Sequence, residues 1–146
     1  MLKFTIQGLK ELEKNLKAEE RRVMNSMAKA HSKVASQAVK VLKTGLSTRM
    51  GRKPSDKNYA TSPQGALPFM HTGGLRDSIG FKLLRKGNKV FSEVGSGAND
   101  ARQVEYAKYL EGRNNDGIRP FLWSIEKIYT ADNIISLFNQ YYKASK

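Results

Sequence analysis

The sequence predicts an α+β fold in which a long N-terminal α-helix packs on a small antiparallel β-sheet, together with a short helix and a C-terminal helix. Three observations predict this class. Residues 9–44 run without glycine or proline, residues 79–94 hold two stretches of alternating apolar and polar side chains, and the last thirty residues space their apolar side chains as a helix does. At 146 residues, the chain is expected to form one domain with a single hydrophobic core.

The chain is predicted to begin with a short strand and to continue into the long helix. Leu2, Phe4 and Ile6 alternate with polar residues, which is the period of a half-buried strand. A continuous helix over residues 9–44 would be about 54 Å long, so part of it is expected to project or to bend. Its apolar residues recur mostly three or four apart and form one stripe: Leu9, Leu12, Leu16, Val23, Met27, Ala30, Val34, Ala38 and Val41.

The sequence also bears on the ends and the partner of this helix. Gly45 is expected to follow its last turn, and a break at residues 15–18 is left open. A heptad begun at Leu9 places Glu19 and Ser26 at core positions, so the apolar stripe does not keep one coiled-coil register. The helix is therefore predicted to face the core of its own domain.

Residues 45–71 show neither helical nor strand periodicity. They contain glycine, proline, serine, threonine and asparagine throughout, and a connection of this length is usually functional or disordered. We expect a flexible loop whose first half is basic. The densest basic cluster of the chain lies here, with only Asp56 opposed to it, and forms the candidate surface for DNA or a partner: Lys43, Arg49, Arg52, Lys53 and Lys57.

The second half of the chain predicts a hairpin followed by helices. A glycine-containing turn at 85–88 joins two runs in which every second residue is mostly apolar: Ile79, Phe81 and Leu83, then Val90 and Val94. Residues 102–111 predict a short helix. Pro120 is placed where a C-terminal helix begins, and the apolar face of that helix continues to Tyr141 after a break that the sequence allows at 130–132.

The charge of the chain is strongly positive. Lys and Arg number 26 against 13 Asp and Glu, which gives +13. Such a charge attracts polyanions and opposes self-association at low salt. Two interpretations stay equally open, a solvated basic surface and a functional contact with nucleic acid. The basic residues are spread along the chain and no DNA-reading motif is present, which argues against a reader of base sequence.

Composition excludes several other classes. The chain has no cysteine, so disulfides, thiolate metal sites and cysteine nucleophiles are excluded. No apolar run approaches the roughly eighteen residues of a membrane span, and residues 1–7 lack the apolar core of a secretory signal. We therefore expect a protein that is cytosolic at synthesis and has no membrane partner.

No catalytic, metal-binding or cofactor-binding constellation is evident. Neither His31 nor His71 has a second ligand three or four residues away, so both are expected to be structural or solvated. Glu105 and Glu111 lie six apart on a predicted helix and point to different faces. Residues 72–75 lack the Lys-Ser/Thr ending of a phosphate loop, and no serine stands in a nucleophile elbow. The prediction is a protein that is not an enzyme and needs no cofactor.

Three segments, HTGGLRDSI (71–79), VEYAKYLEGR (104–113) and IRPFLWSIEKI (118–128), resemble the tail-completion, or head–tail joining, proteins of tailed bacteriophages and prophages. The order and spacing of the matches cover nearly the whole chain. The sequence departs from the family pattern in two places: Gly112 follows Glu111 immediately, and residues 114–117 lengthen the segment before Arg119. The subfamily is therefore left open. The matching positions are Gly8, Leu9, Thr72, Gly73, Leu75, Ser78, Ile79, Tyr106, Ala107, Tyr109, Glu111, Arg119, Pro120 and Phe121.

The resemblance implies a structural protein of the virion neck. Such proteins form a ring-shaped homo-oligomer, often a hexamer, that completes the tail and docks it to the head connector or stopper protein and to the tail tube. DNA passes through the ring, so contacts with it are expected to be independent of sequence. The protein would be found in the host cytoplasm during assembly and then in the virion.

The motif positions are expected to serve the fold. Residues 72–74 would let the backbone turn tightly into the strand, Pro120 would pre-set a helical turn, and Arg119 would pair with Glu111 or Asp116. The alternative function, from another class, is a basic architectural or single-stranded nucleic-acid-binding module that uses the 43–57 cluster.

Overall fold

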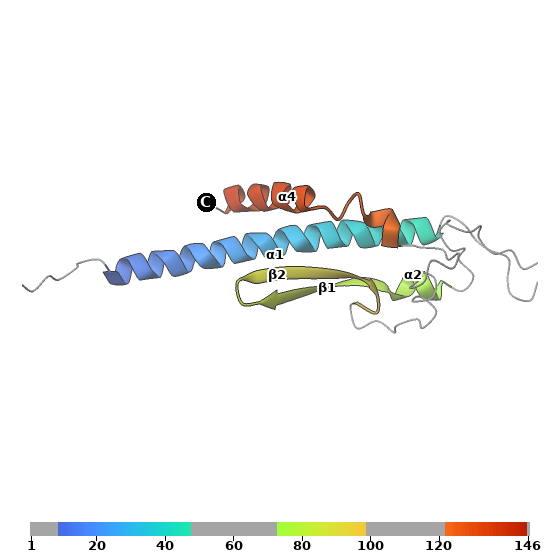
Figure 1. Ribbon diagram of the computed structural model, residues 1–146, viewed down its shortest axis with the longest axis horizontal. Helices are drawn as coiled ribbons and strands as arrows, with labels where there is room; N and C mark the ends of the chain where they lie inside the picture. The colour runs from blue at the N-terminus through green and yellow to red at the C-terminus, as the bar shows by residue number, and fades with distance from the viewer. Residues whose placement is uncertain (1–8, 48–72, 99–121, 146) are drawn as a thin grey trace, which may run out of the picture.

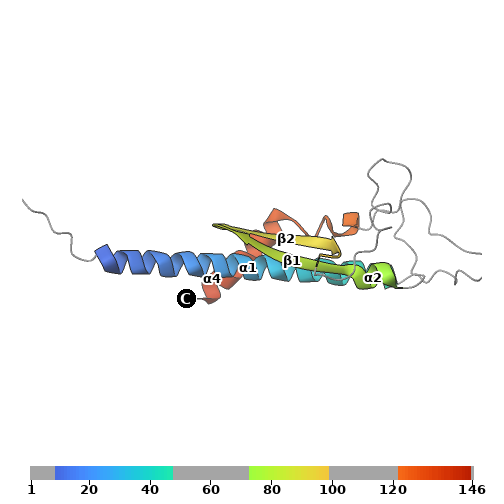
Figure 2. The same cartoon turned by 90° about the horizontal axis from the view of Figure 1, so that it is seen from below.

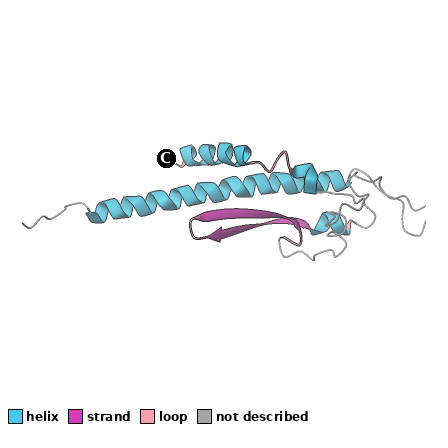
Figure 3. Ribbon diagram, in the orientation of Figure 1, coloured by secondary structure: helices cyan, strands magenta, loops and turns pink. Residues whose placement is uncertain are grey.

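The structure, a computed structural model, describes residues 9–47, 73–98 and 122–145 of the chain. A long helix is the central layer, with the C-terminal helix on one side and a two-stranded hairpin on the other (Figures 1 and 3). The predicted α+β class is confirmed. The elements are α1 (Leu9–Ser47), α2 (Gly74–Ser78), β1 (Ile79–Lys86), β2 (Lys89–Ser96), the 3₁₀ helix η1 (Leu122–Ile125) and α4 (Ala131–Ala144). The strand predicted at 2–6, residues 48–71 of the loop predicted at 45–71, and the helix predicted at 102–111 lie outside the described residues.

Helix α1 is continuous over 39 residues, so the break left open at 15–18 does not occur. The expectation that Gly45 ends the helix is wrong, because α1 continues to Ser47. Leu46 in the additional turn is only 2% exposed, and it packs against Leu75 and Ile79. Burying a leucine gains about 1.5–3 kcal/mol, which exceeds the roughly 0.5–1 kcal/mol that a glycine costs inside a helix.

The buried surface of α1 is wider than the single stripe that the sequence predicts. Ala30, Val34 and Ala38 of that stripe are buried, but Leu12 and Leu16 are exposed, as is Val41. The second half of the helix is packed on two sides, whereas its first turns extend beyond both neighbours (Figure 1). Two-sided packing buries residues outside the stripe: Ser26, Ala28, Ala35, Leu42 and Leu46.

The predicted hairpin is confirmed. Strands β1 and β2 are antiparallel, with Ile79 opposite Ser96 at the open end and Lys86 opposite Lys89 at the turn. Gly87 in the turn has φ 56°, a left-handed conformation that two-residue hairpin turns require. The hairpin lies along α1, and its turn is directed toward the N-terminal end of that helix (Figures 1 and 2).

A short helix, α2, precedes β1 and was not predicted from the sequence. Gly73 adopts a left-handed conformation at φ 77°, and its carbonyl accepts a hydrogen bond from the Asp77 N–H at 2.9 Å. A Cβ at Gly73 would lie 3.2 Å from Nη2 of Arg76. The expectation that residues 72–74 turn tightly into the strand is therefore wrong for Gly73 and Gly74. They start one helical turn, which buries Leu75 against the end of α1.

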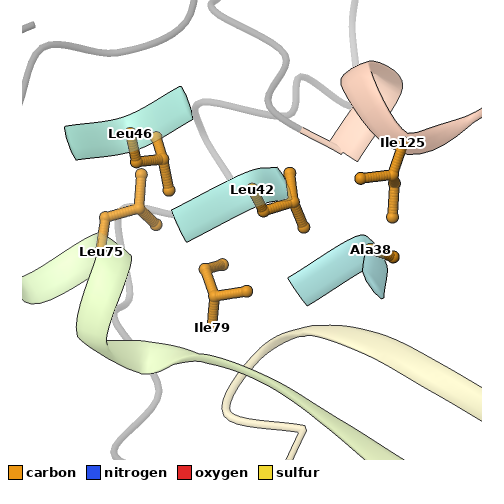
Figure 4. Packing of buried hydrophobic residues seen from close by; sticks show 6 residues of the cluster. All are labelled: Ala38, Leu42, Leu46, Leu75, Ile79 and Ile125. Atoms are coloured by element: carbon orange, nitrogen blue, oxygen red, sulfur yellow. The ribbon is translucent and has the colours of Figure 1, made fainter. Parts of the chain in front are cut away.

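The hydrophobic core lies where the C-terminal part of α1 meets α2, β1 and η1. Figure 4 shows six side chains that converge there from these four elements. Leu42 and Ile79 have no exposed surface, and they are among the largest fully buried side chains of the described residues. The cluster consists of Ala38, Leu42, Leu46, Leu75, Ile79 and Ile125.

The C-terminal segment is divided where the sequence allows a break. The Thr130 hydroxyl caps α4 by accepting a hydrogen bond from the Asn133 N–H at 3.3 Å. Before this cap, residues 122–125 form one 3₁₀ turn, not the α-helix that was expected to begin at Pro120, a residue outside the described part. The short turn lets Ile125 enter the core while α4 packs on another part of α1.

Replacing Leu42 by alanine tests where the core lies. We expect Leu42→Ala to lower the free energy of unfolding by about 2–5 kcal/mol, because it leaves a cavity where four elements meet. Val41→Ala, at the adjacent and 40% exposed position, is the matched control and should cost less than about 1 kcal/mol. Urea titration followed by circular dichroism measures both. Equal losses for the two variants would contradict this placement of the core.

Candidate functional site

Three groups of polar side chains stand out in the described residues. The polar node consists of His31, Ser92 and Tyr129, the C-terminal clasp of Glu19, Arg22, Tyr142 and Ser145, and the basic tip of Lys82, Arg85, Lys86 and Lys89. The first two lie between elements of the fold and the third lies at its surface. The three are therefore described separately, from their contacts to the chemistry they allow.

The polar node joins three elements. Nδ1 of His31, on α1, lies 2.9 Å from the Ser92 hydroxyl on β2. The Tyr129 hydroxyl, just before α4, is hydrogen-bonded to the same Ser92 hydroxyl and donates to the Ser92 carbonyl. Ser92 shares a face of the hairpin with Val90 and Val94, because side chains alternate along a strand. Val90 is buried and Val94 packs against the core, so this face is the one that meets α1.

One assignment of protons satisfies every bond of the node. The Tyr129 hydroxyl donates to the Ser92 carbonyl, the Ser92 hydroxyl donates to Tyr129, and Nδ1–H of His31 donates to Ser92. A histidine that activates a serine nucleophile must accept the hydroxyl proton instead. With this assignment of protons, His31 is a donor toward Ser92, and the node links α1 to β2 and to the segment before α4.

Burial lowers the pKa of His31 below its ordinary value of 6.5. The imidazole is half-buried between α1 and β2, where a positive charge loses hydration. The neutral form is therefore favoured in the folded protein. No spacing rule in the sequence links His31 to Ser92, which is 61 residues away, so the node becomes visible only when the hairpin is placed on α1.

The C-terminal clasp fixes the end of α4 on α1. The guanidinium of Arg22 lies 4.3 Å from the centre of the Tyr142 ring, and its Nη2 donates to the Tyr142 carbonyl at 3.0 Å. Nε of Arg22 donates to the Ser145 hydroxyl at 2.9 Å, and Nη1 lies 3.1 Å from Oε2 of Glu19. The Tyr142 hydroxyl donates to the carboxylate of Glu19, and this bond raises the pKa of Tyr142. Arg22 thus satisfies a terminal carbonyl of α4 while it stacks on the last aromatic ring of that helix.

The basic tip surrounds the hairpin turn. Its four cationic side chains are exposed, and in the strand register only Glu93, opposite Lys82, brings an acidic residue to this end of the hairpin. The tip lies at the other end of the hairpin from α2 and the core (Figure 2). Exposed Lys and Arg side chains at this density can contact phosphate groups without reading bases. The basic residues at 85–89 are visible in the sequence, but the sequence pattern there indicates only a hairpin turn.

The basic cluster predicted at 43–57 is described at one position. Lys43 is half-buried on α1. The pKa of Asp77 on α2 is lowered mainly by the hydrogen bond from Nε of Arg76, at 2.7 Å, and the charge of Lys43 adds to this lowering. The other members of the cluster lie outside the described residues: Arg49, Arg52, Lys53 and Lys57.

The motif positions fall into two groups. Gly73, Leu75, Ser78 and Ile79 are all buried, and they meet at the junction between α2 and β1. The Ser78 hydroxyl donates to the Leu75 carbonyl at 2.8 Å, so even the polar member of this group stabilises the junction. The remaining candidate positions lie outside the described residues: Thr72, Tyr106, Tyr109, Glu111, Arg119, Pro120 and Phe121.

Within residues 9–47, 73–98 and 122–145, no group of three or more His, Asp or Glu side chains is arranged to hold a metal ion. In the same part of the chain, no helix combines the length and the apolar character that crossing a bilayer requires.

The lowered pKa of His31 predicts a pH-dependent stability. The unfolded chain binds a proton near pH 6.5 and the folded chain only at lower pH, so the free energy of unfolding should fall as pH drops below about 6.5. His31→Gln should remove this part of the decrease, which the wild-type chain keeps. Urea midpoints measured between pH 5 and 8 report the difference. Parallel curves for wild type and His31→Gln would contradict the prediction.

Comparisons with protein-family models, with curated proteins and with solved structures found no match to this chain.

Proposed function

We propose that this chain is a non-enzymatic, ring-forming component of a phage neck, which completes the tail and docks it to the head connector. The observation that carries the proposal is that the described motif positions are buried in the structure. The residues through which the sequence resembles tail-completion proteins include Leu75, Ser78 and Ile79, and these are buried at the junction on which the core is built. Proteins that share a fold are expected to share the residues that stabilise it, so buried motif positions support the resemblance.

The electrostatics of the chain support a passage for DNA. The net charge is +13, and the exposed basic tip offers several cations with one acidic residue opposite. A moving genome allows only contacts that are independent of base sequence, and cations at the end of a hairpin provide such contacts. In this proposal, the basic tip and the 43–57 cluster are the two surfaces that DNA passes.

The proposed partners are copies of this chain, the head connector or stopper protein, and the tail tube protein. The proposed locations are the host cytoplasm during assembly and the virion afterwards, with no membrane and no cofactor involved. The polar node agrees with a structural role, because its hydrogen bonds link α1 to β2 and to the segment before α4.

Assembly can be measured directly. We expect the purified chain, alone or mixed with candidate connector and tail tube proteins, to form closed rings whose mass is a fixed multiple of 16.4 kDa. Light scattering and electron microscopy would show them. Failure to bind the connector, the tail tube or itself under any of these conditions would overturn the neck function.

The alternative function, a basic architectural or single-stranded nucleic-acid-binding module, is favoured by the exposure of the basic tip. The two functions differ in what charge removal does. If Arg49, Arg52, Lys53 and Lys57 are changed to serine, a nucleic-acid-binding module should lose affinity for DNA, whereas a neck protein should still form rings.

The basic tip should contribute to DNA binding under both functions. Changing Arg85, Lys86 and Lys89 to serine should weaken binding to a single-stranded oligonucleotide and reduce the slope of log K against log salt by up to about 2. Changing Lys10, Lys14 and Lys17 to serine removes the same charge at exposed positions of α1 and serves as the control. Equal slopes for the two triple variants, measured by fluorescence anisotropy between 50 and 200 mM salt, would exclude the tip as a phosphate contact.

A further inference from the structure

The first turns of α1 project from the rest of the described structure. All side chains from 10 to 18, here called the projecting segment, are exposed, and α1 extends there beyond both the hairpin and α4 (Figure 1). Leu12 is 58% exposed and Leu16 is 62% exposed. A helix of so few turns gains little stability in water without a packing partner. The segment therefore presents two large apolar side chains that neither the hairpin nor α4 covers.

The two leucines continue the contact between α1 and α4. That contact ends at the C-terminal clasp, where Glu19 and Arg22 hold Tyr142. Leu16 precedes Glu19 by three residues and Leu12 precedes Leu16 by four, so the three side chains lie on one face of the helix. The face of α1 that α4 covers thus extends about two further turns past the end of α4, and on those turns it is apolar and open.

The first turns of α1, residues 9–21, differ in net charge from the chain as a whole. Residues 9–21 contain four basic side chains (Lys10, Lys14, Lys17 and Arg21) and four acidic ones (Glu11, Glu13, Glu19 and Glu20), so their net charge is zero. The full excess of +13 therefore lies elsewhere in the chain. Two copies repel each other through most of their surface but not here, and a polyanion gains no net attraction at this place.

We propose that Leu12 and Leu16 dock against a second copy of this chain and form part of the contact between subunits. The inference rests on the proposed ring-forming function, because it names the surface through which copies of the chain meet. Continuity with the α1–α4 contact gives the surface its apolar character. Residues 9–21 have no net charge in a chain of +13, so this surface neither repels a second copy nor attracts nucleic acid, and a second copy is the partner that we infer.

The test compares two variants of equal charge. Leu12→Glu combined with Leu16→Glu lowers the net charge by two, and so does Lys14→Glu alone. Lys14 is two residues from each leucine and therefore lies on the opposite side of the helix. We expect the double variant to raise the dissociation constant of the assembly roughly tenfold per leucine, and Lys14→Glu to change it little. Sedimentation across a range of protein concentrations measures the constants, and circular dichroism checks that both variants keep their helices.

A second measurement locates the contact with single-cysteine variants. The chain has no cysteine, so Leu16→Cys and Lys14→Cys each provide a single site for an environment-sensitive fluorophore. The probe at Leu16→Cys should shift its emission to the blue as assembly proceeds, and the probe at Lys14→Cys should not. A shift at Leu16→Cys that follows added single-stranded DNA instead of protein concentration would overturn the inference in favour of a polyanion.

The outcomes separate this inference from the neck function. If the double variant assembles as wild type does, the subunit contact lies elsewhere, and the inference is wrong while ring formation stands. A wild-type chain that stays monomeric at every concentration also overturns the inference. The neck function then depends on binding to the connector and the tail tube alone.

Discussion

The packing of α1 on two sides is the constraint on which the other described elements depend. A single hairpin is at best marginally stable in water, and a 14-residue helix such as α4 is marginal as well. Each of them gains its stability by covering one side of the same central helix. The core around Leu42 and Ile79 forms where α2, β1 and η1 converge on the C-terminal part of α1, and loss of that cluster would release elements on both sides of α1.

Polar contacts determine how the outer layers sit on this frame. The polar node attaches β2 and the segment before α4 to α1, and the C-terminal clasp attaches the far end of α4. Buried and half-buried polar groups require partners, so a shift of either layer along α1 would leave several hydrogen bonds unmade. Apolar packing holds the layers together, and these two groups of polar contacts fix the alignment of the layers along α1.

The surface of the chain divides into regions with different chemistry. The basic tip and the residues around 43–57 are each predominantly basic, whereas residues 9–21 at the start of α1 have no net charge and include two exposed leucines, Leu12 and Leu16. The proposed neck function requires contacts with DNA that let the DNA slide, and lasting contacts between copies of the chain. Charge without base-specific geometry suits the first, and an apolar stripe on a neutral helix suits the second.

The sequence by itself determined the α+β class, the hairpin and its glycine turn, and the break before α4, because each follows from local periodicity or from a single residue such as Thr130 or Gly87. Only the tertiary structure decided that α1 continues past Gly45, that α2 forms, and that Leu42 is buried while Leu12 is exposed. The polar node and the clasp join residues 61 and 120 positions apart. Periodicity reports which side chains share a face of one element, but a contact depends on what lies against that face, and distant parts of the chain provide it.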